Sequence, residues 1–175
     1  MDLKTFNKAV GTIFDKLLSD YGFKLKRKKT EQFICDRIYV NGDRYVKISG
    51  DVHPRDFPPH YNIVLGKGSL DWPDCDWNSV ALWRMKRLID PKAKAKEYSL
   101  EQMDNDKLGH SLGHAKNELL DYGQKFLIGD IEFFDKARRE QNKDRPPYKI
   151  HTPTDSGGLQ TTLDDESKRL KEKYS

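Results

Sequence analysis

Residues 33–52 read FICDRIYVNGDRYVKISGDV and decide how the fold can be built. Two runs rich in β-branched and aromatic residues meet at Asn41-Gly42. An Asn-Gly pair between such runs is the strongest short-range signal of a β-hairpin. We therefore expect two antiparallel strands here, and the other elements can be placed around them.

The side chains of this hairpin allow two registers. A two-residue turn at Asn41-Gly42 pairs Val40 with Asp43 and puts the aliphatic residues of the two strands on opposite faces. A three-residue loop with Gly42 in the left-handed conformation pairs Tyr39 with Asp43 instead. We expect this second register, because a single buried face is what specifies strand pairing. Its apolar face holds Ile34, Ile38, Val46 and Ile48, and its other face holds Cys35, Arg37, Tyr39, Tyr45, Lys47 and Ser49.

Asp36 is the exception to this pattern, because it falls on the apolar face. A buried carboxylate without a partner is costly. Asp36 therefore lies at the sheet margin or belongs to a site.

Composition indicates a soluble protein of one domain. Of the 175 residues, 35% are hydrophobic and 34% charged, which allows a sizeable core beneath an unusually charged surface. The 32 Lys and Arg nearly balance the 28 Asp and Glu, so charge acts through local patches. No run approaches the ~18 apolar residues of a membrane span, and the N-terminus lacks the apolar stretch of a signal peptide. We therefore expect a cytoplasmic protein without a membrane partner, whose Cys35 and Cys75 are reduced thiols.

Hydrophobic periodicity places the first half of the chain. Residues 2–21 carry apolar side chains at three- and four-residue steps, which predicts an amphipathic helix that ends at Gly22. A short strand follows at once, then the hairpin, then a proline-rich loop and a fourth strand at 61–66. Residues 23–66 therefore predict an antiparallel meander.

The second half reads mainly as helix. Residues 79–90 fit either a helix or a strand. A long helix is expected over 105–123, ended by Gly123, and another over 131–142. Residues 151–175 read as a C-terminal tail that is flexible or docked on a single domain of residues 1–150.

These elements predict an α+β fold. We expect a four-stranded antiparallel meander with the N-terminal helix and the C-terminal helices packed on one face.

Two short motifs resemble those of a known group. GFK at 22–24 follows the first helix, and YG at 122–123 with FL at 126–127 closes the late one. Together they resemble an uncharacterised family of small bacterial α+β proteins, often suspected of serving as immunity or accessory factors near toxin genes. The resemblance covers roughly residues 5–128. It implies a protein partner and brings no catalytic residues.

Residues 71–77, DWPDCDW, form the most unusual cluster in the chain. Tryptophans in a polar loop serve as lids on the core or as anchors for a partner, since tryptophan is enriched among interface hot spots. The glycine and the distant glutamate of a calcium loop are missing. The candidate partner-binding residues are Asp71, Trp72, Asp74, Asp76 and Trp77.

A basic run offers a second candidate surface. Lysines neutralise phosphates and aromatic side chains stack on bases, so a nucleic-acid site could combine this run with Phe23, Tyr39 and Tyr45. The alternative is a solvated strand whose lysines protect a sheet edge. The run consists of Lys24, Lys26, Arg27, Lys28 and Lys29.

His110 and His114 have the spacing that puts two imidazoles on one helix face, and Glu118 follows one turn later. Such a row could bind a transition metal. A helical wheel puts both histidines opposite the apolar stripe, so a solvated polar face is the better interpretation.

No nucleophile elbow, phosphate loop or dinucleotide fingerprint is present, which argues against an enzyme and against a cofactor. We expect a protein-binding factor of the immunity or inhibitory kind that occupies a partner protein. Nucleic-acid binding through residues 24–29 and metal-dependent hydrolysis are the alternatives.

Overall fold

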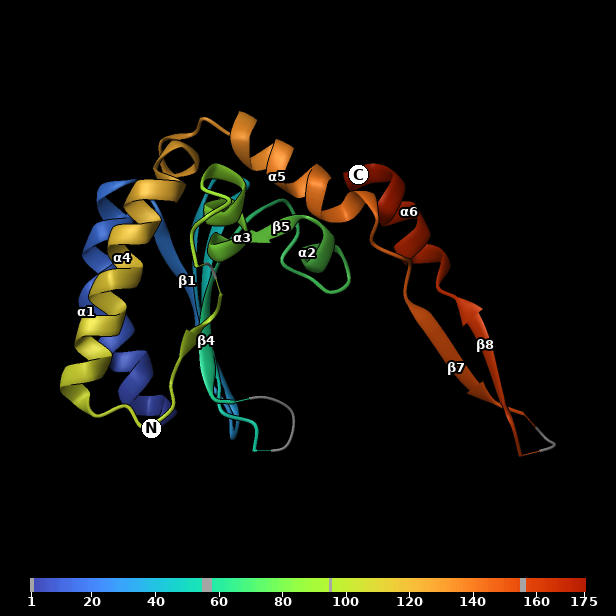
Figure 1. Ribbon diagram of the computed structural model, residues 1–175, viewed down its shortest axis with the longest axis horizontal. Coiled ribbons are helices and arrows are strands. Elements are labelled where there is room, and N and C mark those ends of the chain that lie inside the picture. Colours follow the sequence, from blue (N-terminus) through green and yellow to red (C-terminus); the bar gives the residue numbers. More distant parts are fainter. Residues whose placement is uncertain (1, 55–57, 95, 155–156) are drawn as a thin grey trace.

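The computed structural model describes residues 2–54, 58–94, 96–154 and 157–175. It is an α+β structure with one antiparallel sheet, helices against it, and a separate two-stranded sheet near the C-terminus (Figure 1). Within those ranges, no helix is long and apolar enough to cross a membrane.

The central sheet contains the expected meander and extends beyond it. Strands β1 (Lys24–Thr30), β2 (Ile34–Asn41), β3 (Arg44–Asp51) and β4 (His60–Lys67) pair with one another antiparallel in chain order. Two short strands, β5 (Ser79–Ala81) and β6 (Tyr98–Ser99), both pair with β4. The sheet therefore contains more strands than the four predicted. Strands of two or three residues are too short to show an alternation of apolar and polar side chains in the sequence.

The register of the β2–β3 hairpin differs from both expected ones. Asn41 pairs with Arg44, and Tyr39 pairs with Val46, so Gly42-Asp43 forms the turn. Gly42 has a φ of 61°, and a glycine with positive φ at the first turn position is typical of type II′ hairpins. The expected single apolar face is wrong: Ile48 and Val46 face the helices, while Ile38 lies on the other side and is also buried.

Two long helices cover one face of the sheet. Helix α1 (Leu3–Asp20) begins at Asp2, whose carboxylate accepts hydrogen bonds from the backbone N–H of Lys4 (3.2 Å) and Thr5 (3.1 Å). Helix α4 (Asn105–Ile128) packs beside α1 on the same face (Figure 1). The predicted α1 is confirmed.

The predicted end of α4 at Gly123 is wrong. The helix continues to Ile128 and ends at Gly129, which has a φ of 100°. Gly123 is buried where the helix meets the sheet, and an added Cβ there would lie 3.4 Å from Cδ1 of Leu65. This glycine therefore permits close packing and does not end the helix.

Of the remaining elements, the helix of residues 82–89 packs on α4, and those that follow α4 in the chain extend away from the covered face. Residues 79–90 contain both expected forms, since β5 is followed directly by helix α3 (Leu82–Ile89). Helix α5 (Glu132–Lys143) runs away from the top of the sheet in Figure 1, and helix α6 (Asp165–Tyr174) packs on α5 and on the short helix α2 (Asp74–Trp77). The expectation that all the C-terminal helices pack on one face of the sheet is therefore wrong.

Strands β7 (Lys149–Pro153) and β8 (Leu159–Leu163) form a two-stranded ribbon between α5 and α6, which we call the arm. In Figure 1 the arm projects from the domain on the side of the sheet opposite α1 and α4.

Candidate functional site

Two residues of the 71–77 cluster hold the C-terminal segment to the domain. The Trp77 side chain is fully buried and packs with Leu170 and Tyr174 of α6. The Asp74 carboxylate accepts hydrogen bonds from the Tyr174 hydroxyl (3.1 Å to each oxygen) and from Nδ2 of Asn78 (2.9 Å). Trp77 therefore closes a small second core rather than facing solvent.

Asp76 has the same kind of internal partner. Its carboxylate forms an ion pair with Arg145 and accepts a hydrogen bond from the Tyr148 hydroxyl. The Arg145 guanidinium also lies over the Trp77 ring, 4.3 Å from its centroid. Burial and the contact with Asp76 raise the pKa of Tyr148, so this hydroxyl stays protonated. Asp74, Asp76 and Trp77 thus bind this chain's own C-terminal segment.

Trp72 differs from the rest of the cluster. Its side chain is 73% exposed, yet it stacks on the Tyr148 ring with centroids 5.7 Å apart and ring planes 15° apart. Tyr148 immediately precedes β7, so Trp72 stands at the base of the arm. Its neighbour Asp71 is also exposed.

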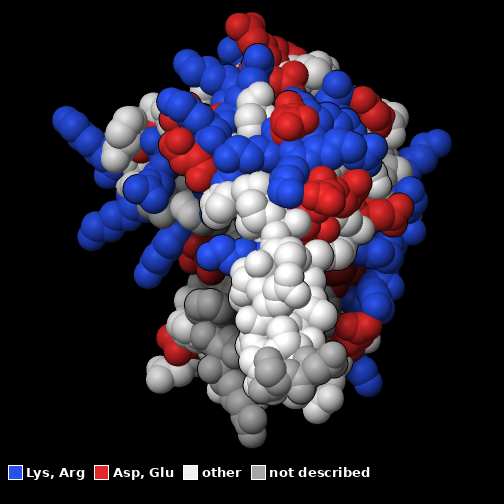
Figure 2. All heavy atoms as spheres, turned by 90° about the vertical axis from the view of Figure 1, so that its right-hand side faces the viewer, with Lys and Arg blue, Asp and Glu red and all other residues white. Residues whose placement is uncertain are grey.

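The arm is exposed along both strands. Every residue of β7 and β8 is exposed, including Ile150 (47%), Leu159 (69%) and Leu163 (45%). In Figure 2 the described part of the arm is a largely uncharged region below a surface where Lys and Arg alternate with Asp and Glu. The arm therefore offers apolar side chains and backbone edges, with little charge.

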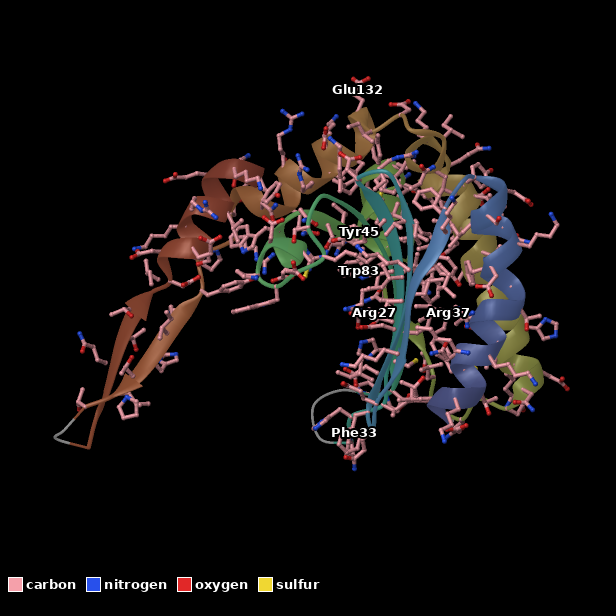
Figure 3. The ribbon with its side chains drawn as sticks, turned by 180° about the vertical axis from the view of Figure 1, so that it is seen from behind. Arg27, Phe33, Arg37, Tyr45, Trp83 and Glu132 are labelled. Carbon is pink, nitrogen blue, oxygen red and sulfur yellow. The ribbon has the colours of Figure 1, made fainter. Side chains whose placement is uncertain are left out.

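The face of the sheet opposite α1 and α4 is called the outer face. Figure 3 shows Arg27, Tyr45 and Trp83 pointing to this side, toward the arm, whereas Arg37 points toward α1. Asp36 lies on the outer face, not on the expected apolar one, and its carboxylate is 3.5 Å from Arg27 Nη2 and 3.2 Å from Lys47 Nζ. These two ion pairs compensate the charge of the Asp36 carboxylate.

A cavity of about 390 Å³ lies at the edge of the outer face, where β4 and β5 meet the start of α3 and the end of α5. Its lining includes Asn62, Trp83, Arg84 and Arg145. Sequence reasoning did not find this cavity, because its residues come from segments that are far apart in the chain.

The basic run forms β1, the edge strand of the sheet. All of its residues are exposed, and Arg27 and Lys29 pair with Asp36 and Glu31. The aromatic residues expected to stack on bases are buried, with Phe23, Tyr39 and Tyr45 at most 3% exposed. Lys24, Lys26, Lys28 and their neighbours therefore present charge along a sheet edge without those aromatic partners.

The histidine row contains one residue with an unexpected environment. His110 and His114 are exposed. Glu118 is buried, forms an ion pair with Lys86, and has its carboxylate 3.1 Å from Nε2 of His114. The Tyr98 hydroxyl donates a second hydrogen bond to this carboxylate at 2.5 Å. Among the residues that the structure describes, no group of three or more His, Cys, Asp or Glu side chains is arranged to hold a metal ion.

Arg37 forms a second buried polar cluster beneath α1. Its guanidinium donates hydrogen bonds to the Asn7 backbone oxygen (2.7 Å) and to the Asp15 carboxylate (2.9 Å), and an added Cβ at Gly11 would lie 2.7 Å from it. The Tyr39 hydroxyl donates to the same Asp15 carboxylate at 2.7 Å. This cluster joins helix to sheet: Arg37 is 6% exposed, and the side chain of its partner Asp15 reaches solvent.

Comparisons of the chain with family models, with curated proteins and with solved structures find no match.

Proposed function

We propose that this chain is a protein-binding factor that acts by occupying a partner protein, in the manner of immunity or inhibitory proteins. The partner would contact Trp72 and the arm on the outer-face side of the sheet. The observation that carries this proposal is Trp72 itself, a tryptophan 73% exposed that is nevertheless held in place by stacking on Tyr148.

An exposed tryptophan that is already ordered suits an interface anchor. A few aromatic or arginine residues supply most of the affinity in protein complexes. A side chain that is fixed before binding loses less conformational entropy when the partner arrives. Tyr148, which holds Trp72, is itself fixed by Asp76.

The arm supports the same proposal. A single two-stranded ribbon is only marginally stable in water. Ribbon edges with free backbone groups can add to a sheet of another protein, and exposed apolar residues such as Leu159 can fill pockets on it. An arm of this kind gains stability when a partner covers it.

The alternatives have weaker support. Nucleic-acid binding through residues 24–29 would have exposed cations but not the expected stacking partners, because Phe23, Tyr39 and Tyr45 are at most 3% exposed. Metal-dependent hydrolysis through Glu118 needs a free carboxylate, whereas Lys86 and Tyr98 both occupy this one.

Affinity capture from the native host tests the proposal. Three baits are compared: the intact chain, Trp72→Ala, and a variant in which residues 149–163 are replaced by a short Gly-Ser linker. Ile128→Ala is the matched control, since Ile128 is an apolar residue 66% exposed at the end of α4. We expect the intact chain and the control to bind one protein with equal affinity. Loss of a hot-spot side chain should weaken binding by about 2 kcal/mol, or roughly 30-fold.

The melting temperature separates binding from folding. Trp72→Ala should melt close to the intact chain, because little of its side chain is buried. The proposal fails if the intact chain retains no protein partner, if the captured material is nucleic acid, or if Trp72→Ala and the armless variant bind as tightly as the intact chain.

A further inference from the structure

Two residues that line the cavity at the edge of the outer face each carry a buried polar atom without a partner. Nε1 of Trp83 and Oδ1 of Asn62 both lack a hydrogen bond within the described part of the chain. Val64 of β4 pairs with Ala81 of β5. Asn62 lies two residues before Val64 and Trp83 two residues after Ala81, so both lie at the same end of this antiparallel strand pair. More than nine in ten buried polar groups in proteins are hydrogen-bonded, and an unpaired one costs ~1–3 kcal/mol. A donor and an acceptor left unpaired beside one cavity point to a ligand that offers both.

A cation lines the same cavity. Arg84 forms no ion pair with any residue that the structure describes. Desolvation and the nearby Arg145 guanidinium lower the pKa of Arg84, and the Asp76 and Glu97 carboxylates, which act in the opposite sense, do not cancel them, although the Arg84 side chain is in contact with solvent. A bound anion would favour the charged form of Arg84.

The other charged groups of the cavity already have partners. Arg145 is paired with Asp76. The Glu97 carboxylate accepts a hydrogen bond from Nδ2 of Asn62 (2.9 Å) and lies 3.6 Å from Nε2 of His60. Arg84 is therefore the lining charge that is available to a ligand.

We propose that this cavity binds a carboxylate-bearing, extended peptide segment of the partner protein. The carboxylate pairs with Arg84, and one peptide unit donates its N–H to Oδ1 of Asn62 and accepts a hydrogen bond from Nε1 of Trp83. This assignment rests on the proposed function, which makes the ligand part of a protein. A volume of about 390 Å³ lies at the lower end of the range for ligand pockets and suits a segment of a few residues.

Other ligands match the lining less well. Inorganic phosphate at neutral pH carries one or two O–H groups and can pair with the same three side chains, but it would fill only a small part of a cavity of about 390 Å³. A neutral amide satisfies Asn62 and Trp83 and leaves Arg84 without a counter-ion. A peptide with a carboxylate meets all three requirements.

Indole N–H resonances report on the cavity directly. The ¹⁵N-labelled chain is titrated with four probes at fixed ionic strength, and the Trp83 signal is assigned with Trp83→Phe. The probes are acetyl-Gly-Asp-Gly-amide, acetyl-Gly-Gly with a free terminal carboxylate, acetyl-Gly-Asn-Gly-amide, and inorganic phosphate. The first two distinguish a side-chain carboxylate from a chain terminus.

We expect one of the two carboxylate peptides to shift the Trp83 indole signal in a saturable way. The neutral peptide and phosphate should bind at least about tenfold more weakly. Arg84→Gln should weaken the peptide by a similar factor. Arg87→Gln is the matched control, since Arg87 lies on the same helix but does not line this cavity, and it should leave binding unchanged.

Four results would overturn the inference: no saturable shift with either carboxylate peptide, equal binding of the neutral peptide, tighter binding of phosphate, or full binding by Arg84→Gln. None of these results would affect the capture experiment with Trp72→Ala. The two proposals can therefore fail separately.

Discussion

Replacing Glu118 with glutamine should remove about 3 kcal/mol of folding stability at pH 7, because the change breaks a buried ion pair from one side. The side chains of Glu118 and Lys86 are only 9% and 16% exposed. Breaking such a pair costs ~3–5 kcal/mol, and the lower end applies here because the ammonium of Lys86 is close enough to the surface to be partly rehydrated. For a chain of this size the loss corresponds to a fall of roughly 6–12 °C in melting temperature.

A double-mutant cycle isolates the pair. Lys86→Met keeps most of the aliphatic stem and removes the ammonium, which leaves the Glu118 carboxylate with the Tyr98 hydroxyl and Nε2 of His114 as its partners. The double variant should be more stable than the sum of the single losses predicts, with a coupling energy of about 1.5 kcal/mol or more. Urea denaturation followed by circular dichroism measures all four proteins.

The contribution of Glu118 to folding stability depends on pH in a definite direction. Burial raises the pKa of Glu118, but hydrogen bonds from Lys86 and Tyr98 outweigh it, so the pKa lies below the usual 4.5. The unfolded chain therefore takes up this proton first as pH falls. The contribution of the carboxylate is complete above pH 4.5 and is lost as pH falls through the lowered value in the folded state. The difference between the intact chain and Glu118→Gln should shrink in that acidic window.

Three results would refute this account of Glu118. The first is that the stability losses of Glu118→Gln and Lys86→Met simply add in the double variant. The second is that the stability difference between the intact chain and Glu118→Gln is the same at pH 7 and in acid. The third is that both single variants are as stable as the intact chain. If Zn²⁺ stabilised the intact chain but not His110→Ala, the metal interpretation would replace it.

Two further predictions concern helix α4 and the C-terminal segment. Gly113→Ala should stabilise the chain by ~0.5–1 kcal/mol, because an added Cβ meets nothing within 4 Å. Gly123→Ala should destabilise the chain, because the added Cβ would lie 2.8 Å from Cδ1 of Leu119. Melting temperatures that change in the same direction for both variants would contradict this prediction. Limited proteolysis should cut within residues 149–163, whose strands are exposed, and leave α6 bound to the domain, because Leu170 is buried against Trp77. A C-terminal fragment that separates from the domain on gel filtration under native conditions would contradict this prediction.

The predictable part of the fold is the part set by local pattern. The apolar stripe of residues 2–21 and the alternation around Asn41-Gly42 each arise from neighbours in sequence, and both elements are present. The hairpin register was wrong because both faces of the hairpin bury side chains. Tyr39 and Ile48 face the helices, and Ile38 is buried on the other side, so the aliphatic residues did not have to share one face. The end of α4 was wrong because Gly123 meets Leu65, a contact that sequence spacing does not reveal.

The candidate site was less predictable, because its environment is made by distant segments. Asp74 and Asp76 looked like a free acidic patch, yet Tyr174 and Tyr148 occupy them from about a hundred and about seventy residues away. Glu118 looked like a surface residue beside two histidines, and Lys86 from another helix pairs with it. Only the unusual density of tryptophan in residues 71–77 signalled that this loop has a special role.

The internal contacts of the 71–77 cluster also couple binding to folding. Asp76 fixes Tyr148, Tyr148 supports Trp72, and Trp77 packs against α6. The proposed partner, which would cover Trp72 and the arm, would bind only the docked form of the C-terminal segment and would therefore stabilise that form. At a free concentration one hundred times the dissociation constant, the gain is about 2.7 kcal/mol. A change at Trp77 would therefore weaken both docking and the proposed binding, whereas a change at Trp72 would remove only the proposed contacts to the partner and leave the second core intact. This difference is why Trp72, and not Trp77, is the informative position for testing the proposed function.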